Sequence, residues 1–242
     1  MSYYNLKEHE DFHLDPSDLL KSLPPETDFL ILCTPNNPTS SAVRQENIET
    51  ILSACKKRGI FVMIDETYVE FAPCIEEITA MPLTKIFDNL MVIRGVSKFY
   101  AAPGLRLGYG VTGNQEFLSS LKRCQNPWSL NSIAAFAGEK MLQDTAYIKE
   151  TRALILSQRK QLCKTLREVP FLKIYEPYAN FILVRLLKEG LTSHQVFEHA
   201  IRQGLMIRDC SSFKSLEGEY IRFCIMKPED NARLIQCLKE LP

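Results

Sequence analysis

Short apolar runs alternate with an amphipathic segment in the first part of the chain. Residues 28–33 and 60–64 form nearly continuous apolar runs, which are typical of strands buried on both faces of a sheet. Between them, residues 41–58 place most of their apolar side chains on one helical face, and Gly59 ends that segment. A strand, a helix and a strand in this order predict a parallel pair with a right-handed crossover.

The rest of the chain continues this pattern as far as a long, charged helical segment over residues 144–169, and then changes it. Beyond that segment the predicted strands are short and close together. We therefore expect an α/β fold, with a mostly parallel sheet sandwiched by helices over residues 1–151 and a smaller α+β domain over residues 152–242. The remaining predicted strands are 90–93, 107–111, 172–175, 181–186, 205–207 and 220–225, and the remaining helices are 17–23, 114–123, 131–142, 192–204 and 228–238.

Composition indicates a globular protein and argues against several kinds of partner. Hydrophobic residues make up 45% of the chain, and 29 basic residues balance 29 acidic ones, so no basic field favours nucleic acid. The chain has neither the apolar core of a signal peptide nor a run of about eighteen apolar residues, so we expect a cytoplasmic protein that does not cross a membrane. The eight cysteines lack the spacing of zinc ligands, so we expect reduced thiols, no metal site and a small-molecule partner.

Polar side chains that can take part in catalysis or binding follow three of the predicted strands. Asn37, Asp65 and Lys98 follow these strands, and ligands of open α/β sheets collect at the carboxyl ends of strands. Asp65 ends an apolar strand, where an ionised carboxylate needs a cation, and the protonated nitrogen of a pyridine ring would meet that need. Lys98 and Arg106 lie among apolar and small residues, so we expect them to be buried, and a buried cation needs an anion or a carbonyl as its partner. A lysine that forms an imine with an aldehyde cofactor fits that setting.

Each of these residues, taken singly, also fits an ordinary structural role. Asn37 lies in a segment with the composition of a strand-to-helix turn, Asp65 could cap a helix, Arg106 could form a surface ion pair, and Lys98 could be a surface lysine. A glycine pattern at residues 108–113 matches the dinucleotide-binding fingerprint, but no acidic residue ends a second strand about twenty residues later. We therefore set dinucleotide binding aside.

The order of these segments resembles the pyridoxal-phosphate enzymes of the class I/II aminotransferase family. The chain has Asn37-Pro38-Thr39, then Asp65-Glu66-Thr67-Tyr68, then the segment from Lys98 to Tyr109, which reads KFYAAPGLRLGY. That last segment is most similar to the threonine-phosphate decarboxylase branch, close to the histidinol-phosphate aminotransferases. The resemblance extends from about residue 11 to the C-terminus, and implies pyridoxal 5′-phosphate as the cofactor and a homodimer as the assembly. Further matching segments are 127–131, 204–210 and 220–223.

The resemblance also implies roles for single residues. Lys98 is the catalytic residue that forms the imine with the cofactor, and Asp65 faces the ring nitrogen. In the substrate site, Arg222 takes a carboxylate, and Arg208 takes a phosphate or is a solvated loop cation. The other cofactor-binding residues are Asn37 and Tyr68 at the phenolate oxygen, and Ser97 and Arg106 at the phosphate.

The chain departs from the family pattern in three places. Gly95 stands where the family usually has a serine or threonine, and Ser40 replaces the usual glycine after Asn-Pro-Thr. Family members also have a substantial N-terminal portion that no stretch before Asn37 resembles, so we expect the large domain to be truncated on that side. Three functions stay open: decarboxylation of L-threonine O-3-phosphate on the route to cobalamin, transamination of the histidinol-phosphate type, and a fragment without catalysis.

Overall fold

The computed structural model describes residues 1–241, and the chain divides into two compact units. The parallel-sheet unit comprises residues 14–35 and 42–148, and the antiparallel-sheet unit comprises residues 1–13, 36–41 and the chain from residue 149 onward. The sequence places a domain boundary after residue 151, whereas this division by contacts comes after residue 148. The division by contacts also assigns residues 1–13 and 36–41 to the unit that contains the C-terminal part.

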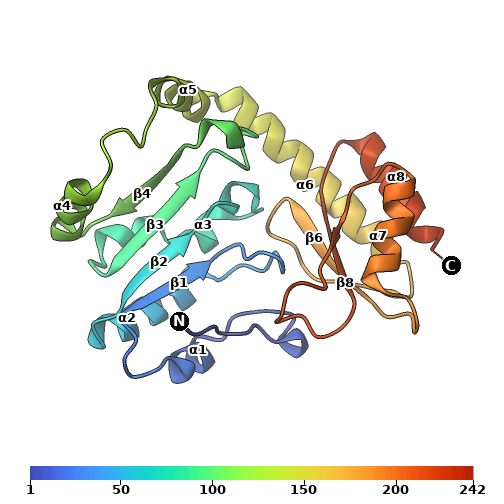
Figure 1. The fold of residues 1–242 in the computed structure, drawn as a ribbon, viewed down its shortest axis with the longest axis horizontal. Coiled ribbons are helices and arrows are strands. Elements are labelled where there is room, and N and C mark those ends of the chain that lie inside the picture. Colours follow the sequence, from blue (N-terminus) through green and yellow to red (C-terminus); the bar gives the residue numbers. More distant parts are fainter. Residues whose placement is uncertain (242) are drawn as a thin grey trace. The chain divides into compact units, whose positions relative to one another are not determined.

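The parallel-sheet unit has a four-stranded mixed sheet in the order β1-β2-β3-β4 (Figure 1). The first three strands are parallel, and β4 runs antiparallel to β3, with Gly95 opposite Gly108. The chain between these glycines folds back without a crossover helix, which explains the antiparallel last strand. The predicted α/β class is confirmed. The strands are β1 (Phe29–Cys33), β2 (Phe61–Asp65), β3 (Leu90–Gly95) and β4 (Gly108–Thr112).

Helices lie on both sides of this sheet. The helix α2 (Gln45–Lys57) buries four apolar residues and contacts β2, while Phe117 of α4 (Gln115–Cys124) packs on Phe61 with ring centroids 4.4 Å apart. Asn114 caps α4, as the sequence predicts, by accepting a hydrogen bond from the backbone N–H of Phe117. The other helices are α1 (Pro16–Ser22), α3 (Ile75–Ile78), α5 (Ser132–Gln143), and the short 3-10 helices η2 (Val69–Phe71), η3 (Met81–Lys85) and η4 (Pro103–Leu105).

One prediction about this sheet is wrong. The sequence predicts that β1 is buried on both faces, but Phe29 is 46% exposed and Ile31 is 55% exposed. Leu30 and Leu32, which alternate with them, are buried. The continuous apolar run therefore identified the strand correctly, but only one face of β1 is covered by residues 1–241.

The antiparallel-sheet unit has a four-stranded sheet in the order β5-β6-β8-β7, and every neighbouring pair is antiparallel. The capping box of Thr192 and Gln195 opens α7 as the sequence predicts, and Pro228 begins α8. A strand is expected at 205–207, but the pairing begins at Arg208 instead. The elements are β5 (Leu172–Ile174), β6 (Phe181–Leu186), α7 (Ser193–Arg202), β7 (Arg208–Asp209), β8 (Tyr220–Cys224), α8 (Pro228–Lys239) and the long helix α6 (Thr145–Arg167), which begins in the other unit.

The N-terminal segment belongs to the core of the antiparallel-sheet unit. Phe12 is buried against Tyr175 and Tyr220, with ring centroids 4.9 and 6.1 Å away. The carboxylate of Glu8, in the 3-10 helix η1 (Glu8–Glu10), accepts hydrogen bonds from Lys173 at 2.8 Å, Tyr175 at 2.7 Å and Arg185 at 2.5 Å. Among residues 1–241, no helix is long and apolar enough to cross a membrane.

Candidate functional site

Two buried neighbours fix the backbone around Lys98. The loop that leaves β3 buries Val96 and Phe99, each 1% exposed, on either side of Ser97 and Lys98. The carbonyl of Phe99 accepts a hydrogen bond of 2.8 Å from the hydroxyl of Tyr147, and the ring of Phe99 packs on that of Phe71 at 5.2 Å. The side chain of Lys98 therefore projects from a short segment that is anchored at both ends.

The expectation that Lys98 and Arg106 are buried is wrong. Both residues are exposed. Arg106 adopts a left-handed conformation with φ of 54° after η4, and its guanidinium donates to the carbonyl of Pro103 at 3.2 Å. Because water solvates an exposed cation, burial does not require a bound anion here. The case for a site depends instead on the groups that surround Lys98.

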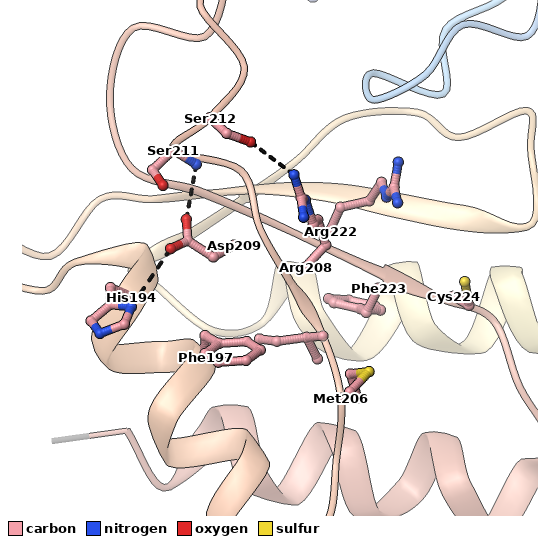
Figure 2. A pocket seen from close by; sticks show the side chains of 11 residues that line it. His194, Phe197, Met206, Arg208, Asp209, Ser211, Ser212, Arg222, Phe223 and Cys224 are labelled. Atoms are coloured by element: carbon pink, nitrogen blue, oxygen red, sulfur yellow. Dashed lines mark hydrogen bonds and ion pairs between the residues drawn. The ribbon is translucent and has the colours of Figure 1, made fainter.

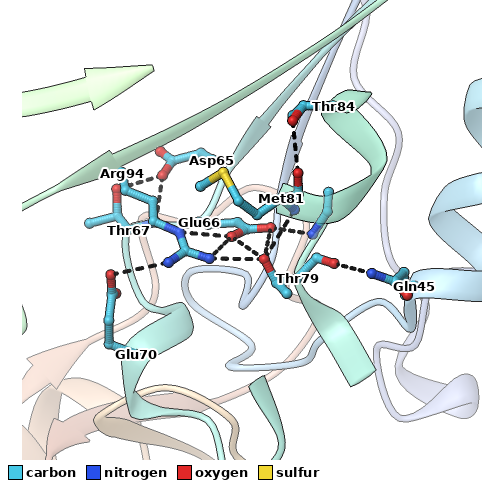
Figure 3. Close-up of polar contacts among 10 residues, drawn as sticks. Gln45, Asp65, Glu66, Thr67, Glu70, Thr79, Met81, Thr84 and Arg94 are labelled. Carbon is cyan, nitrogen blue, oxygen red and sulfur yellow. Dashed lines mark hydrogen bonds and ion pairs between the residues drawn. The ribbon is translucent and has the colours of Figure 1, made fainter. Parts of the chain in front are cut away.

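Asp65 and Tyr68 lie at the same edge of the sheet as the Lys98 segment. β2 and β3 are adjacent and parallel, and the ammonium of Lys98 is 5.9 Å from the ring centroid of Tyr68. Oδ1 of Asp65 accepts hydrogen bonds from the backbone N–H and the hydroxyl of Thr67, at 2.9 and 2.5 Å (Figure 3). Within the described residues Oδ2 of Asp65 has no hydrogen-bond partner, so it can accept a proton-bearing group from a ligand.

In the antiparallel-sheet unit, two arginines are direct neighbours across strands. Arg208 of β7 lies opposite Arg222 of β8. Arg208 donates to the hydroxyl of Ser212 at 2.8 Å, and the guanidinium of Arg222 contacts Oδ1 of Asn37 and lies 4.9 Å from the ring centroid of Phe181. Neither arginine forms an ion pair with an acid within residues 1–241. Since like charges opposite each other destabilise a sheet, this arrangement favours a bound anion.

A cavity of about 540 Å³ adjoins these arginines (Figure 2). Asp209 faces it, but its Oδ1 already accepts hydrogen bonds from the hydroxyl of Ser193 and the backbone N–H of Ser211, and its Oδ2 lies 3.8 Å from Nδ1 of His194. Burial opposes ionisation of Asp209, yet these hydrogen bonds outweigh it and lower the pKa of its carboxyl group. The acid is thus held by hydroxyl and amide donors rather than by the arginines. His194, Phe197, Met206 and Phe223 also line the cavity.

The sequence indicates only a substitution in a turn at Ser40, but in the structure Ser40 holds the segment that carries Asn37. Ser40 is fully buried and adopts a left-handed conformation with φ of 62°. Its carbonyl accepts the backbone N–H of Tyr178, and its hydroxyl accepts that of Ala179, both at 2.8 Å. A glycine would suit this conformation without strain but could not make the second contact. Asn37 is therefore presented by a loop fixed to the antiparallel-sheet unit.

Comparison with known proteins identifies the family. The model of the family "Aminotransferase class I and II" matches residues 1–238. The chain belongs to this family. It is 33% identical over 98% of its length to a threonine-phosphate decarboxylase of Salmonella typhimurium, and 34% identical over 95% of its length to a histidinol-phosphate aminotransferase of Methanopyrus kandleri. It spans 64% and 57% of the lengths of these two relatives, which is less than two thirds of each.

A solved structure shows the same fold. The histidinol-phosphate aminotransferase from Clostridium acetobutylicum superposes with a TM-score of 0.88 at 30% identity, covering 95% of this chain and 68% of that one. The resemblance stated from the sequence motifs is thereby confirmed, and the cofactor of the family is pyridoxal 5′-phosphate.

The residues at the ends of β2 and β3 fit this cofactor. Asp65 offers a carboxylate oxygen with no hydrogen-bond partner among the described residues to a protonated ring nitrogen, Tyr68 offers a hydroxyl, and Lys98 offers an exposed amine beside Tyr68. Of the other predicted site residues, Ser97 and Arg106 belong to the parallel-sheet unit. Asn37, Arg208 and Arg222 belong to the antiparallel-sheet unit.

Proposed function

We propose that this chain performs pyridoxal-phosphate-dependent chemistry on a phosphorylated amino acid, with decarboxylation of L-threonine O-3-phosphate as the reaction. The observation that carries the proposal is the cross-strand pair Arg208–Arg222, which has no acidic partner in the described chain and adjoins a cavity. A phosphorylated amino acid has two anionic groups, and two neighbouring guanidiniums suit both of them. Transamination of the histidinol-phosphate type is the alternative, since relatives of both kinds match the chain.

In this proposal the parallel-sheet unit supplies every cofactor contact except that of Asn37, which belongs to the antiparallel-sheet unit. Lys98 attaches the cofactor and moves a proton at the substrate α-carbon, and Oδ2 of Asp65 accepts the hydrogen bond of the protonated ring nitrogen. When bound, the cofactor supplies an electron sink for negative charge at that carbon. The remaining cofactor contacts are Tyr68 and Asn37 to the phenolate oxygen, and Ser97 and Arg106 to the phosphate.

The substrate contacts are assigned to the arginine pair. Arg222 takes the carboxylate, because a guanidinium offers two parallel N–H groups to two oxygens and the ring of Phe181 supports its plane. Arg208 takes the phosphate, with Ser212 orienting its guanidinium. By holding the carboxylate and the phosphate, Arg222 and Arg208 would set the orientation of the substrate, and that orientation would decide between loss of carbon dioxide and loss of a proton.

Reductive trapping tests whether the chain binds the cofactor. The purified chain is incubated with pyridoxal phosphate, treated with borohydride and digested, and the modified lysine is identified by mass spectrometry. We expect modification of Lys98, its loss in Lys98→Ala, and no change in Lys85→Ala, which removes an exposed lysine of the same unit. A chain that traps no cofactor would instead support the catalytically inert alternative.

Product analysis then tests the reaction. Carbon dioxide released from L-threonine O-3-phosphate, with the cofactor staying an aldehyde, supports decarboxylation, whereas a keto product and the amine form of the cofactor support transamination. Arg208→Gln should reduce the preference for phosphorylated over unphosphorylated substrate by about 10-fold or more, the loss expected for one charged hydrogen bond. Arg202→Gln, at a position 78% exposed beside Glu198, is the matched control. An unchanged preference in Arg208→Gln would mean that Arg208 is a solvated loop cation.

The homodimer stays a proposal that derives from the family. Sedimentation of the purified chain measures its mass, and a monomer at micromolar concentration would contradict it.

A further inference from the structure

A buried ion pair joins the ends of β2 and β3 (Figure 3). Glu66 is fully buried, and Arg94 is 15% exposed at its side chain. Both Nε and Nη2 of Arg94 donate to the same oxygen of Glu66, at 3.0 and 2.6 Å. The backbone N–H of Glu66 also donates to the carbonyl of Ile93 at 2.9 Å. Side chain and backbone thus tie the two strand ends together at the same point.

The segment before η3 completes the arrangement. The other oxygen of Glu66 accepts the backbone N–H of Ala80 at 2.5 Å, and the hydroxyl of Thr79 lies 3.1 Å from this oxygen and 2.9 Å from the one that Arg94 contacts. Thr79 in turn accepts a hydrogen bond of 2.8 Å from Nη2 of Arg94. Burial opposes the charge of Arg94, but Glu66 and the more distant Glu70 outweigh it and raise the pKa of Arg94. Each partner of the pair is therefore held by several directed contacts.

The pair is separated from the proposed cofactor site by the thickness of the sheet. Side chains alternate between faces along a strand, so Glu66 shares the face of the buried Val62 and Ile64, and Asp65 lies on the opposite face. Since Glu66 is fully buried, it is shielded from any ligand on the face of Asp65. Yet its neighbours in the chain are the proposed site residues: it lies between Asp65 and Tyr68, and Arg94 comes four residues before Lys98.

We propose that Glu66 and Arg94 are positioning residues that hold Asp65, Tyr68 and Lys98 in the arrangement that receives the cofactor. This inference rests on the proposed function. A buried ion pair is weak evidence for stability, because desolvation of the charges offsets much of their attraction. What the pair provides is geometry: two N–H groups of one rigid guanidinium on one oxygen fix the distance and angle between the strand ends. A cofactor site requires such support to within a fraction of an ångström.

The test compares three variants with the parent chain. Glu66→Gln leaves the buried charge of Arg94 without its main partner, so its melting temperature should fall clearly. The double variant Glu66→Gln/Arg94→Gln removes both charges of the pair, at the cost of the 3.8 Å ion contact between Arg94 and Glu70, and should recover most of that fall. Both should bind pyridoxal phosphate about tenfold or more weakly, measured by titration of the trapped adduct. The control Glu77→Gln breaks the exposed pair of Arg44 and Glu77, whose atoms are 2.9 Å apart, and should change neither quantity.

The double variant separates positioning from a purely structural role. If the pair served only stability, recovery of the melting temperature would bring cofactor affinity back with it, and that result would overturn the proposal. Should Glu66→Gln fail to fold, the double variant alone decides the matter, because it does not leave the charge of Arg94 without Glu66.

Hydrogen exchange of the cofactor-free chain provides a readout that does not depend on the proposed function. Backbone amides of residues 66–71 and 95–101 should exchange about tenfold or more faster in the double variant than in the parent, with the Glu77→Gln control unchanged. Equal exchange in parent and double variant would refute positioning even if the cofactor binds. A parent chain that traps no cofactor, but whose double variant shows the faster exchange, would refute the proposed function and leave the positioning of these segments established.

Discussion

Replacing Glu8 with glutamine should weaken the attachment of the N-terminal segment to the antiparallel sheet in a pH-dependent way. Hydrogen bonds from Lys173 and Tyr175, followed by Arg185, lower the pKa of Glu8 from 4.5 to about 2, against the opposing effect of burial. At about 1.4 kcal/mol per pH unit, this difference corresponds to roughly 3 kcal/mol. Because the side chain of Glu8 is 30% exposed, solvent screening reduces the expected contribution to about 1–2 kcal/mol.

The direction of the pH dependence follows from the lowered pKa. The unfolded chain binds a proton at Glu8 below about pH 4.5, whereas the folded chain resists it until about pH 2. The stabilisation is therefore complete above the unfolded pKa and is lost as the pH falls through the folded one. Glutamine resembles the protonated acid, so the parent and Glu8→Gln should differ most at neutral pH and converge toward pH 2.

Urea unfolding of the parent and Glu8→Gln between pH 7 and pH 2.5, followed by circular dichroism, measures this convergence. Glu10→Gln is the control, since Glu10 lies in the same 3-10 helix but its ion partners within residues 1–241, Lys7 and His9, are 3.8 and 3.6 Å away. Two stability curves that stay parallel across this range would refute the reasoning, because they would show that Glu8 has the same pKa in the folded and unfolded chain.

Five further substitutions test three local features by urea unfolding. Ser40→Ala should cost about 1–3 kcal/mol, since it leaves the buried N–H of Ala179 without its acceptor in a left-handed turn, while Ser40→Gly should cost less because it removes the backbone strain. Ile31→Ala, on the exposed face of β1, should cost less than about 1 kcal/mol, and Ile64→Ala, fully buried on β2, about 2–5 kcal/mol. Thr192→Ala should cost about 1 kcal/mol through loss of the capping box. Equal costs within the serine or isoleucine comparison, or none at Thr192, would contradict the corresponding argument.

Much of the fold could be predicted because its signals are local. The strand at 181–186 is found with its predicted bounds, and the helices opened by Asn114, Thr192 and Pro228 begin where the caps and the proline place them. A cap or a helix-starting proline acts through the first turn of its own helix, so a few neighbouring residues contain the whole signal. Asn37, Asp65 and Lys98 could be identified for the same reason, because each lies at or just after the end of its own strand.

Burial could not be predicted in the same way. The apolar run of β1 predicts two covered faces, and the apolar surroundings of Lys98 predict a buried lysine, but Ile31 and Lys98 are both exposed. An apolar residue in a strand indicates only that the strand packs against another part of the protein. Whether its second face is covered depends on elements elsewhere in the chain: α4 reaches Phe61 on β2 through Phe117, and Phe29 on β1 stays 46% exposed.

The support of the candidate site was missed for a related reason. The residues that would perform chemistry stand at strand ends, where a reader of the sequence looks for them. The residues that hold those segments in place act across long separations: 28 residues between Glu66 and Arg94, and 139 between Ser40 and Ala179. No periodicity relates positions so far apart, and Glu66 resembles any acidic residue in a turn. The only local feature that distinguishes Glu66 is its position directly after a buried strand, next to Asp65. In this chain, therefore, the proposed chemical groups can be identified from motifs, whereas the contacts that set their geometry become visible only when the strands are paired.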